Sequence, residues 1–417
     1  MATLALGSGT GRLISIATIP VVTRLYSPED LGVLSVFTSV VLILAPLATW
    51  RYVLALPLPR HDGLAMNLLA LALCLLVGIG SCLAFVLWLL GEVLFGLLSL
   101  EVLAPWWWLI VLGVLGTAAY EALTLWATRK RAYKVMAKTQ VTQSVAGAII
   151  KIGLGVAGLQ PLGLLVGQVV AQAGGIVRLL RSFLPDFRAG WRHVRANRVC
   201  SIARRHKGFP LWRVPSQLLM TFSMQAPVLF MAGLFGTTTA GQFGLAVMAL
   251  SIPINVLGQA AGNALYGEAA QLIQTDRGKI MGVAVSIQKN LFLVAVPPAV
   301  ILFFLGDVIF GLLFGREWVE AGRFASVLSI ALVLQFTSAP LIQLINLLRD
   351  QSAFLIINVF RFVGVLAVFQ LPGHLQFEAS QTVVAYAIFS TGFYLMVSLH
   401  VLLALRAEEA GDANAER

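Results

Sequence analysis

Long apolar runs alternate with short polar connections from one end of the chain to the other. Each run continues for about 20 residues, the length of an α-helix that crosses a bilayer, whereas membrane barrel strands alternate over about 10 residues. A window of about 19 residues locates twelve such segments, near residues 3–23, 31–50, 64–90, 103–127, 139–159, 161–180, 214–234, 240–264, 281–305, 323–346, 353–370 and 380–404. The pattern predicts an all-α, polytopic membrane protein of twelve transmembrane helices.

Composition supports the same class. Of the 417 residues, 59% are hydrophobic and 11% are charged, against roughly 45–50% and about 25% in soluble domains. A mean hydropathy of +0.89 over the whole chain is too high for one signal sequence or one anchor. The first apolar segment is predicted to be a span and not a secretory signal, because Arg12 interrupts it and no basic stretch precedes it.

The basic residues predict an orientation. Threading twelve helices through the membrane with both termini on one side places 23 of the 29 Lys and Arg residues on that side, three on the other and three inside spans. Cytoplasmic loops carry the excess of basic residues, so both termini are predicted to lie in the cytoplasm. The asymmetry also accounts for the net charge of +11, which gives no reason to expect a nucleic-acid partner.

A basic segment divides the chain near its middle, with ten Lys and Arg residues between Arg178 and Arg213. We predict a six-helix lobe at 1–180, a basic cytoplasmic connector at 181–213, a second six-helix lobe at 214–404 and a cytoplasmic tail at 405–417.

The connector has a pattern of its own. Arg188, Trp191, Arg192 and Arg195 are spaced to share one side of a short helix. Such a helix is typical of a segment that lies on anionic lipid. A topology signal alone would explain the charges equally well.

The two halves contain a duplicated segment. Residues 90–98 read LGEVLFGLL and residues 305–313 read LGDVIFGLL, with seven of nine positions identical. Both follow a span and leave the membrane on the same side, which predicts a parallel repeat of two lobes related by an axis along the membrane normal. Lys151 and Arg361 also match, at a spacing of 210 residues. Two such lobes around a midplane cavity are typical of alternating-access transporters.

Three cations are predicted to lie inside spans: Arg12, Lys151 and Arg361. An ionised side chain in the hydrocarbon costs about 3 kcal/mol or more, so each should face a bundle interior or a wet cavity. The one deep acid is Glu121, which either pairs with a nearby base such as Arg129 or couples transport to a proton. An excess of buried cations predicts a cavity for an anionic ligand. The alternative is that long basic side chains extend to the headgroups.

Amides form a row on the eighth predicted span. Asn255, Gln259 and Asn263 follow each other at every fourth position, so they share one helix face. They fit two interpretations equally well: hydrogen bonds to the sugar hydroxyls of a ligand, or hydrogen bonds that hold helices together.

Signatures of enzyme chemistry are absent from the sequence. The five histidines are scattered, and no glycine loop with a following Lys could hold a phosphate. Cys74, Cys82 and Cys200 form neither a metal-binding pair nor a disulfide framework. We therefore predict that the protein is no enzyme and uses neither a cofactor nor a metal.

Three stretches resemble a known family. They are residues 20–56 (PVVTRLYSPEDLGVLSVFTSVVLILAPLATWRYVLAL), residues 204–270, which begin RRHKGFPLWRVPSQLL, and residues 312–325 (LLFGREWVEAGRFA). They are similar to the polysaccharide transporters of the Wzx type, the flippases of bacterial O-antigen and exopolysaccharide. The resemblance implies two six-helix lobes, as in multidrug exporters of the same superfamily, and a cationic cavity.

The resemblance also implies a substrate and a place. Members move undecaprenyl-pyrophosphate-linked oligosaccharide from the cytoplasmic to the periplasmic leaflet of the bacterial inner membrane. The implied partners are this anionic lipid-linked oligosaccharide, membrane lipids, and a glycan polymerase or chain-length protein. Alternatives are a multidrug exporter, whose cavity should hold acids, a membrane-embedded glycan polymerase or ligase, and a scaffold for glycan synthesis.

Overall fold

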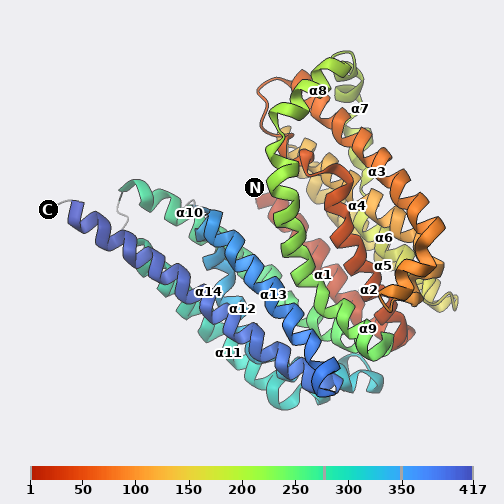
Figure 1. The fold of residues 1–417 in the computed structure, drawn as a ribbon, viewed down its shortest axis with the longest axis vertical. Helices are drawn as coiled ribbons and strands as arrows, with labels where there is room; N and C mark the ends of the chain where they lie inside the picture. The colour runs from red at the N-terminus through yellow and green to blue at the C-terminus, as the bar shows by residue number, and fades with distance from the viewer. Residues whose placement is uncertain (1, 276–278, 348–350, 416–417) are drawn as a thin grey trace. The chain divides into compact units, whose positions relative to one another are not determined.

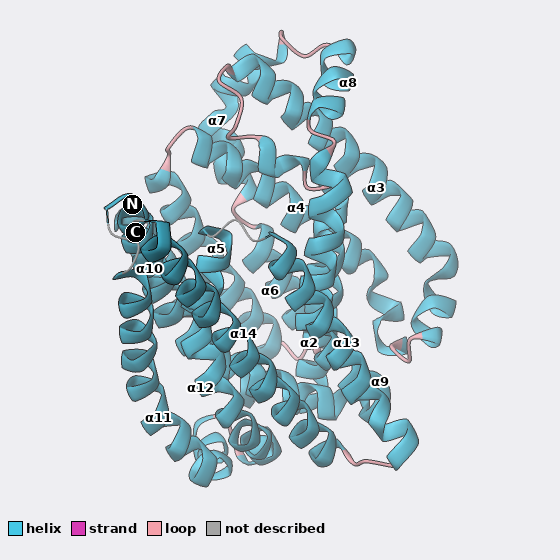
Figure 2. Cartoon of the chain, turned by 60° about the vertical axis from the view of Figure 1, so that its left-hand side comes forward, coloured by secondary structure: helices cyan, strands magenta, loops and turns pink. Residues whose placement is uncertain are grey.

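The computed structural model describes residues 2–275, 279–347 and 351–415, and each regular element in those ranges is a helix (Figures 1 and 2). The all-α prediction is confirmed. The α-helices are α1 Ala2–Leu25, α2 Pro28–Leu44, α3 Asp62–Leu97, α4 Trp107–Arg129, α5 Tyr133–Val156, α6 Leu162–Ala173, α7 Ile176–Trp191, α8 Ala196–Arg205, α9 Val214–Pro253, α10 Gln259–Thr275, α11 Lys279–Leu313, α12 Val319–Leu347, α13 Gln351–Leu375 and α14 Ala379–Ala415. Short 3-10 or π-helical turns are η1 Ala45–Thr49, η2 Tyr52–Ala55, η3 Glu101–Trp106, η4 Phe209–Arg213, η5 Ile254–Gly258 and η6 Arg316–Trp318.

Nine helical stretches within the described ranges are long and apolar enough to cross a membrane. One of them contains all of α9, whose 40 residues are interrupted at Gly236, where φ is 85° and ψ is 168°. The predicted spans 214–234 and 240–264 meet at this break. Helices α1 and α5 lie where two further spans were predicted but are not among the nine. The count of twelve transmembrane helices therefore stays a prediction.

The chain separates into two compact units, Met1–Gly241 and Gln242–Arg417. The first unit holds α1 to α8 and the first part of α9 up to Gly241, and the second holds the remaining helices. The predicted lobes and connector are not tested by this division.

In the first unit, α5 packs between α1 and α6, and α4 packs against α3 and α6. Small residues allow the close approach of α5 and α6, because a Cβ at Gly147 would lie 2.9 Å from the backbone oxygen of Gly167. At the end of the unit where α7 and α8 lie, both helices pack on α3 through a core that includes Trp126, Leu179 and Ile202.

The segment predicted as a connector is therefore folded onto the first unit. Helix α7 ends at Trp191, and Arg195 is the N-cap residue of α8, so Arg188 and Arg195 do not share one short helix. The fully buried Asn67 holds the turn between these helices. Its amide donates to the carbonyl oxygen of His193 at 3.1 Å and accepts from the backbone nitrogen of Arg195 at 3.1 Å.

In the second unit, α12 packs against α11 and α14, and α13 packs against α14. The buried Gln242 fixes the start of α12, because its amide donates to the carbonyl oxygen of Glu317 at 2.6 Å and accepts from the backbone nitrogen of Ala321 at 2.9 Å. A hydroxyl chain lies deeper in this unit, where the Ser338 and Ser398 hydroxyls are 2.7 Å apart and Gln288 donates to Ser398.

The duplicated segment occupies equivalent places in the two units. It forms the ends of α3 and α11, and a short 3-10 turn follows each helix, η3 and η6 respectively. The repeated phenylalanines, Phe95 and Phe310, are both buried, as are Leu103 and Trp318 at the same spacing in the turns. The repeat therefore preserves a helix end and its apolar contacts.

A second matched pair meets directly within the first unit. Gly32 in α2 and Gly241 in α9 are 209 residues apart, as are Pro28 and Thr237. A Cβ at Gly32 would overlap the carbonyl oxygen of Thr237, and a Cβ at Gly241 would overlap that of Pro28. Each half of the contact mirrors the other, as in an isologous interface, and only glycine permits this backbone approach.

Candidate functional site

The strongest candidate site in the first unit surrounds Arg51. Helix α2 ends at Leu44 ahead of Pro46, which cannot continue its hydrogen bonding. The chain then turns through two successive left-handed residues, Trp50 with φ 45° and Arg51 with φ 56°. Left-handed conformations of non-glycine residues cost about 1–3 kcal/mol each and cluster at functional sites. The turn places the Arg51 side chain inside the unit.

The guanidinium of Arg51 is paired with Glu121 of α4, with Nη1 and Oε1 2.7 Å apart and side-chain exposures of 13% and 31%. Its Nη2 also donates to Oε1 of Gln217 on α9, at 3.4 Å. Its Nε is buried and donates to no group in the part of the chain that the structure describes. Arg51 therefore keeps one unused donor, Nε, of the kind that a carboxylate or phosphate oxygen accepts from.

Helix α9 adds a polar row to this site. Gln217, Thr221 and Gln225 follow each other at every fourth position, so they lie on one face. Gln217 donates to the Thr221 hydroxyl at 3.0 Å, and Gln225 accepts from the buried Ser39 hydroxyl of α2 at 3.1 Å. We call Arg51, Glu121, Gln217 and Thr221 the Arg51 cluster.

Glu121 has a different partner from the one that the sequence indicated. Arg129 lies eight residues further along α4, about 12 Å at 1.5 Å per residue, and it pairs with Asp62 at 2.8 Å. The base beside Glu121 is Arg51. The interpretation that Glu121 pairs with a base is right, but the choice of Arg129 was wrong because the two side chains lie two helical turns apart.

The side chain of Lys151 extends from α5 towards α6. Its Nζ donates to Oε1 of Gln168 at 2.7 Å, and its backbone oxygen accepts from the Tyr26 hydroxyl at 2.7 Å. Gly167 leaves room for the aliphatic stem, since a Cβ there would overlap the Lys151 Cγ. A neutral amide orients the ammonium group without neutralising its charge.

Arg361 lies in the second unit, on α13 facing α14. Its guanidinium carbon is 5.5 Å from the ring centre of Phe393 and 5.7 Å from that of Tyr394. Aromatic faces hold a guanidinium by cation–π attraction and, like the amide beside Lys151, carry no negative charge of their own.

The remaining predicted residues are less informative. Arg12 is exposed on α1, next to Gly11, where a Cβ would lie 3.1 Å from the Ser144 hydroxyl of α5. Asn263 is exposed on α10. The side chains of Asn255 and Gln259 lie outside the described residues.

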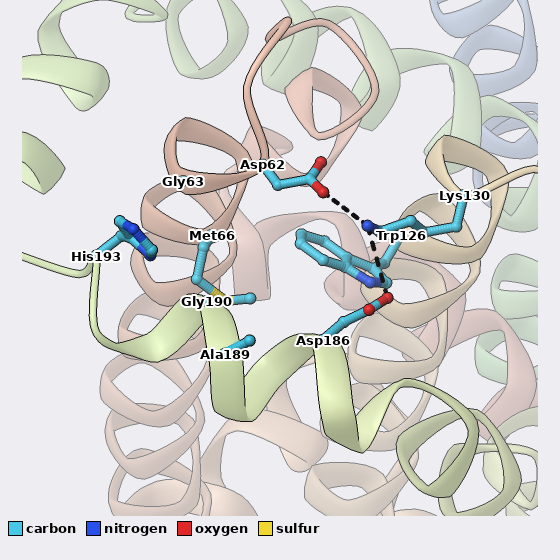
Figure 3. Close-up of a pocket in the computed structure, with 9 residues that line it drawn as sticks. All are labelled: Asp62, Gly63, Met66, Trp126, Lys130, Asp186, Ala189, Gly190 and His193. Carbon is cyan, nitrogen blue, oxygen red and sulfur yellow. Dashed lines mark hydrogen bonds and ion pairs between the residues drawn. The ribbon is translucent and has the colours of Figure 1, made fainter.

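A small charged pocket of about 180 Å³ lies near the start of α3 (Figure 3). Lys130 bridges two acids there, with Nζ 2.7 Å from Asp62 of α3 and 3.7 Å from Asp186 of α7. The same ammonium lies 5.8 Å from the ring centre of Trp126. These contacts connect α7 to α3 and to the end of α4, so they help to hold α7 against the first unit.

Sequence reasoning missed Arg51, Gln217, Thr221 and Gln225. Arg51 stands one residue beyond a predicted span, so it was counted among the cytoplasmic charges. The α9 row has the same four-residue spacing that identified Asn255, Gln259 and Asn263, and applying that spacing to 214–234 would have found it.

Comparison with known proteins finds relatives of the chain. A family model described as "Polysaccharide biosynthesis protein" matches residues 21–323. The succinoglycan biosynthesis transport protein ExoT of Rhizobium meliloti (strain 1021) is 24% identical over 326 residues, which cover 76% of this chain and 62% of ExoT. The chain thus spans less than two thirds of the length of that relative.

Solved structures share the fold. An inward-facing multidrug resistance transporter of the MATE family, in the MOP superfamily, matches with a TM-score of 0.63 and 14% identity over 98% of this chain and 95% of its own. A mutant of the MATE transporter VcmN of Vibrio cholerae matches with a TM-score of 0.58 and 15% identity over 97% of this chain and 95% of its own. At these identities the likeness concerns the fold alone.

Proposed function

Because the chain belongs to the polysaccharide biosynthesis protein family, we propose that it is a flippase for an anionic lipid-linked oligosaccharide in a bacterial inner membrane. The substrate class is an undecaprenyl-pyrophosphate-linked repeat unit of O-antigen or exopolysaccharide, moved from the cytoplasmic to the periplasmic leaflet by alternating access. The observation that carries the proposal is the Arg51 cluster, which holds an arginine inside a membrane-protein unit with one donor atom, Nε, unused.

The physical role of Arg51 is to bind phosphate where water is scarce. A pyrophosphate leaves water at a large cost unless cations and hydrogen-bond donors replace its hydration. The planar guanidinium offers paired donors that match two phosphate oxygens. Glu121 acts as an internal anion that holds Arg51 until the substrate displaces it, so that the empty protein does not carry an unpaired buried charge.

Displacement of Glu121 offers a coupling step. Once the substrate takes Arg51, the carboxylate of Glu121 loses its ion-pair partner in a partly buried position. Uptake of a proton by Glu121 would then link substrate binding to the proton gradient.

The other predicted cations are also proposed to attract the anionic substrate, each from its own unit. Lys151, positioned by Gln168, and Arg361, positioned by Phe393 and Tyr394, keep charges that a pyrophosphate can meet. Arg12 is proposed as a third contact. Asn255, Gln259 and Asn263 are proposed to bind sugar hydroxyls. A glycan polymerase or chain-length protein would act on the delivered unit.

The first test replaces the ion pair without leaving a lone charge. We expect the Arg51→Gln/Glu121→Gln variant to insert normally and to lower the periplasmic delivery of lipid-linked glycan at least tenfold, because an amide pair keeps the contact but not the charge. The measurement is the leaflet distribution of the glycan in the host after depletion of the wild-type protein. Gln217→Ala, which removes one neutral contact of the same cluster, is the milder comparison variant.

The outcomes separate the competing functions. If the pair only stabilises the fold, the double variant transports normally although Arg51→Gln alone fails. Glycans that reach the periplasm but stay unpolymerised after depletion indicate a membrane-embedded polymerase. Normal glycan delivery together with lost export of cationic drugs indicates a multidrug exporter.

A further inference from the structure

Helix α7 divides its residues among three faces. At 3.6 residues per turn, one face packs on the core of the first unit and consists of Ile176, Leu179, Phe183 and Phe187. The ring of Phe187 lies 5.4 Å from that of Trp126, centre to centre. Because this face packs on the core, the orientation of α7 about its own axis is fixed, and the other two faces point away from the core.

The second face is apolar and exposed. It consists of Val177, Leu180, Leu184 and Trp191, of which Val177 and Trp191 are 56% and 59% exposed. These positions recur at intervals of three, four and seven residues and form one stripe. The stripe lies in the second half of the candidate membrane span Leu162–Trp191.

The third face is basic and borders the stripe. Arg181 and Arg188 are exposed along it, and Arg192, the exposed C-cap residue of α7, follows them. The stretch from Arg178 to Arg213 contains ten basic residues and a single acid, Asp186, and that acid faces Lys130 at 3.7 Å. Burial, and next the charge of Arg205, lower the pKa of His206, which disfavours its charged form.

We propose that α7 binds anionic phospholipids, with Leu180, Leu184 and Trp191 at the acyl-chain boundary and Arg181, Arg188 and Arg192 on the lipid phosphates. An apolar stripe beside a row of cations matches the two layers of a leaflet surface, apolar below and anionic above. Trp is the residue most typical of that boundary. Lipid is favoured over a soluble acidic protein because all four stripe residues belong to a candidate membrane span.

The consequence is a lipid-dependent anchor for the first unit. Asn67 and Lys130 already fix α7 to α3 and α4. Tyr52, which follows Arg51 in the chain, and Trp126 belong to the same core as α7. Lipid bound to the outer faces of α7 would therefore hold this end of the first unit in place. This inference concerns lipid binding and stands whether or not the protein flips a glycan.

Quenching of Trp191 by brominated lipid tests the proposal. The full-length protein is reconstituted in nanodiscs with brominated phosphatidylglycerol or brominated phosphatidylcholine, and the contribution of Trp191 is the difference from Trp191→Phe. We expect phosphatidylglycerol to quench Trp191 at least twofold more than phosphatidylcholine at equal content. The excess should disappear in the triple variant Arg181→Gln/Arg188→Gln/Arg192→Gln and persist when the same residues are changed to Lys.

A matched control removes the same charge from α8. Arg198→Gln/Arg204→Gln/Arg205→Gln changes three exposed arginines of the neighbouring helix, which lacks the apolar stripe. This variant should keep the excess quenching. Equal quenching by the two lipids, no quenching of Trp191, or equal losses in the two triple variants would overturn the proposal, and folding is checked by gel filtration of each variant.

Discussion

At the residue scale, Asn67 shows how one buried amide fixes a segment far along the chain. It donates to Gly63 at 2.6 Å and to His193 at 3.1 Å, and it accepts from the backbone of Arg195. Asn67→Ala leaves partly buried backbone groups of His193 and Arg195 without this partner, each at about 1–3 kcal/mol. We expect the free energy of unfolding to fall by about 2–4 kcal/mol, measured by denaturation in mixed micelles.

The control for Asn67 is Asn197, an exposed residue of the same type on α8. Asn197→Ala should change the free energy of unfolding by less than about 0.5 kcal/mol, as is usual for surface positions. Equal losses in the two variants would mean that the turn between α7 and α8 is not held by Asn67.

Single residues also show where sequence reasoning reached its limit. Hydropathy alone predicts that Lys151 and Arg361 lie inside spans, but their partners, Gln168 and the Phe393 ring, depend on packing between helices. Arg51 was missed for a related reason. Its inward direction depends on two left-handed backbone conformations, which no pattern of apolar residues reports.

At the element scale, the contact between α2 and α9 depends on two glycines. In Gly32→Ala or Gly241→Ala, the new methyl group meets a carbonyl oxygen of the other helix, which belongs to backbone and cannot rotate away. We expect each variant to lose about 1–3 kcal/mol of unfolding free energy. Gly78→Ala in α3, where a Cβ meets nothing within 4 Å, should lose none.

The double variant sharpens this prediction. Because Gly32 and Gly241 belong to one contact, separating the helices once relieves both clashes, and the combined loss should be smaller than the sum of the single losses. Additive losses would indicate two independent sites. The sequence supplied the matched spacing of these glycines, but their direct approach required the structure.

At the scale of the whole molecule, the helical class and the family could be predicted, and the number of spans could not be settled. The stretches 20–56 and 204–270 carried the family resemblance, and the matching family model extends over 21–323. Hydropathy could not decide whether α9 crosses the membrane once or twice, because its break at Gly236 interrupts the helix without a polar loop.

Labelling of single cysteines decides the number of crossings. Cys200 on α8 and a cysteine at Glu317, before α12, are both at exposed positions. The twelve-span arrangement places three spans between them, and the nine candidate stretches place two, Phe209–Pro253 and Lys279–Leu313. Three crossings put the two thiols on opposite faces, whereas two put them on the same face.

In a background with Cys74→Ala and Cys82→Ala, we expect an impermeant maleimide to label Cys200 in inverted vesicles only. With Cys200→Ala added, Glu317→Cys should be labelled in intact spheroplasts only. Permeabilised membranes should label both, which controls for access. Labelling of both positions from one face would mean that α9 crosses the membrane once. The six-helix second lobe and the parallel repeat would then both be wrong, because each requires one crossing before Gly236 and another after it.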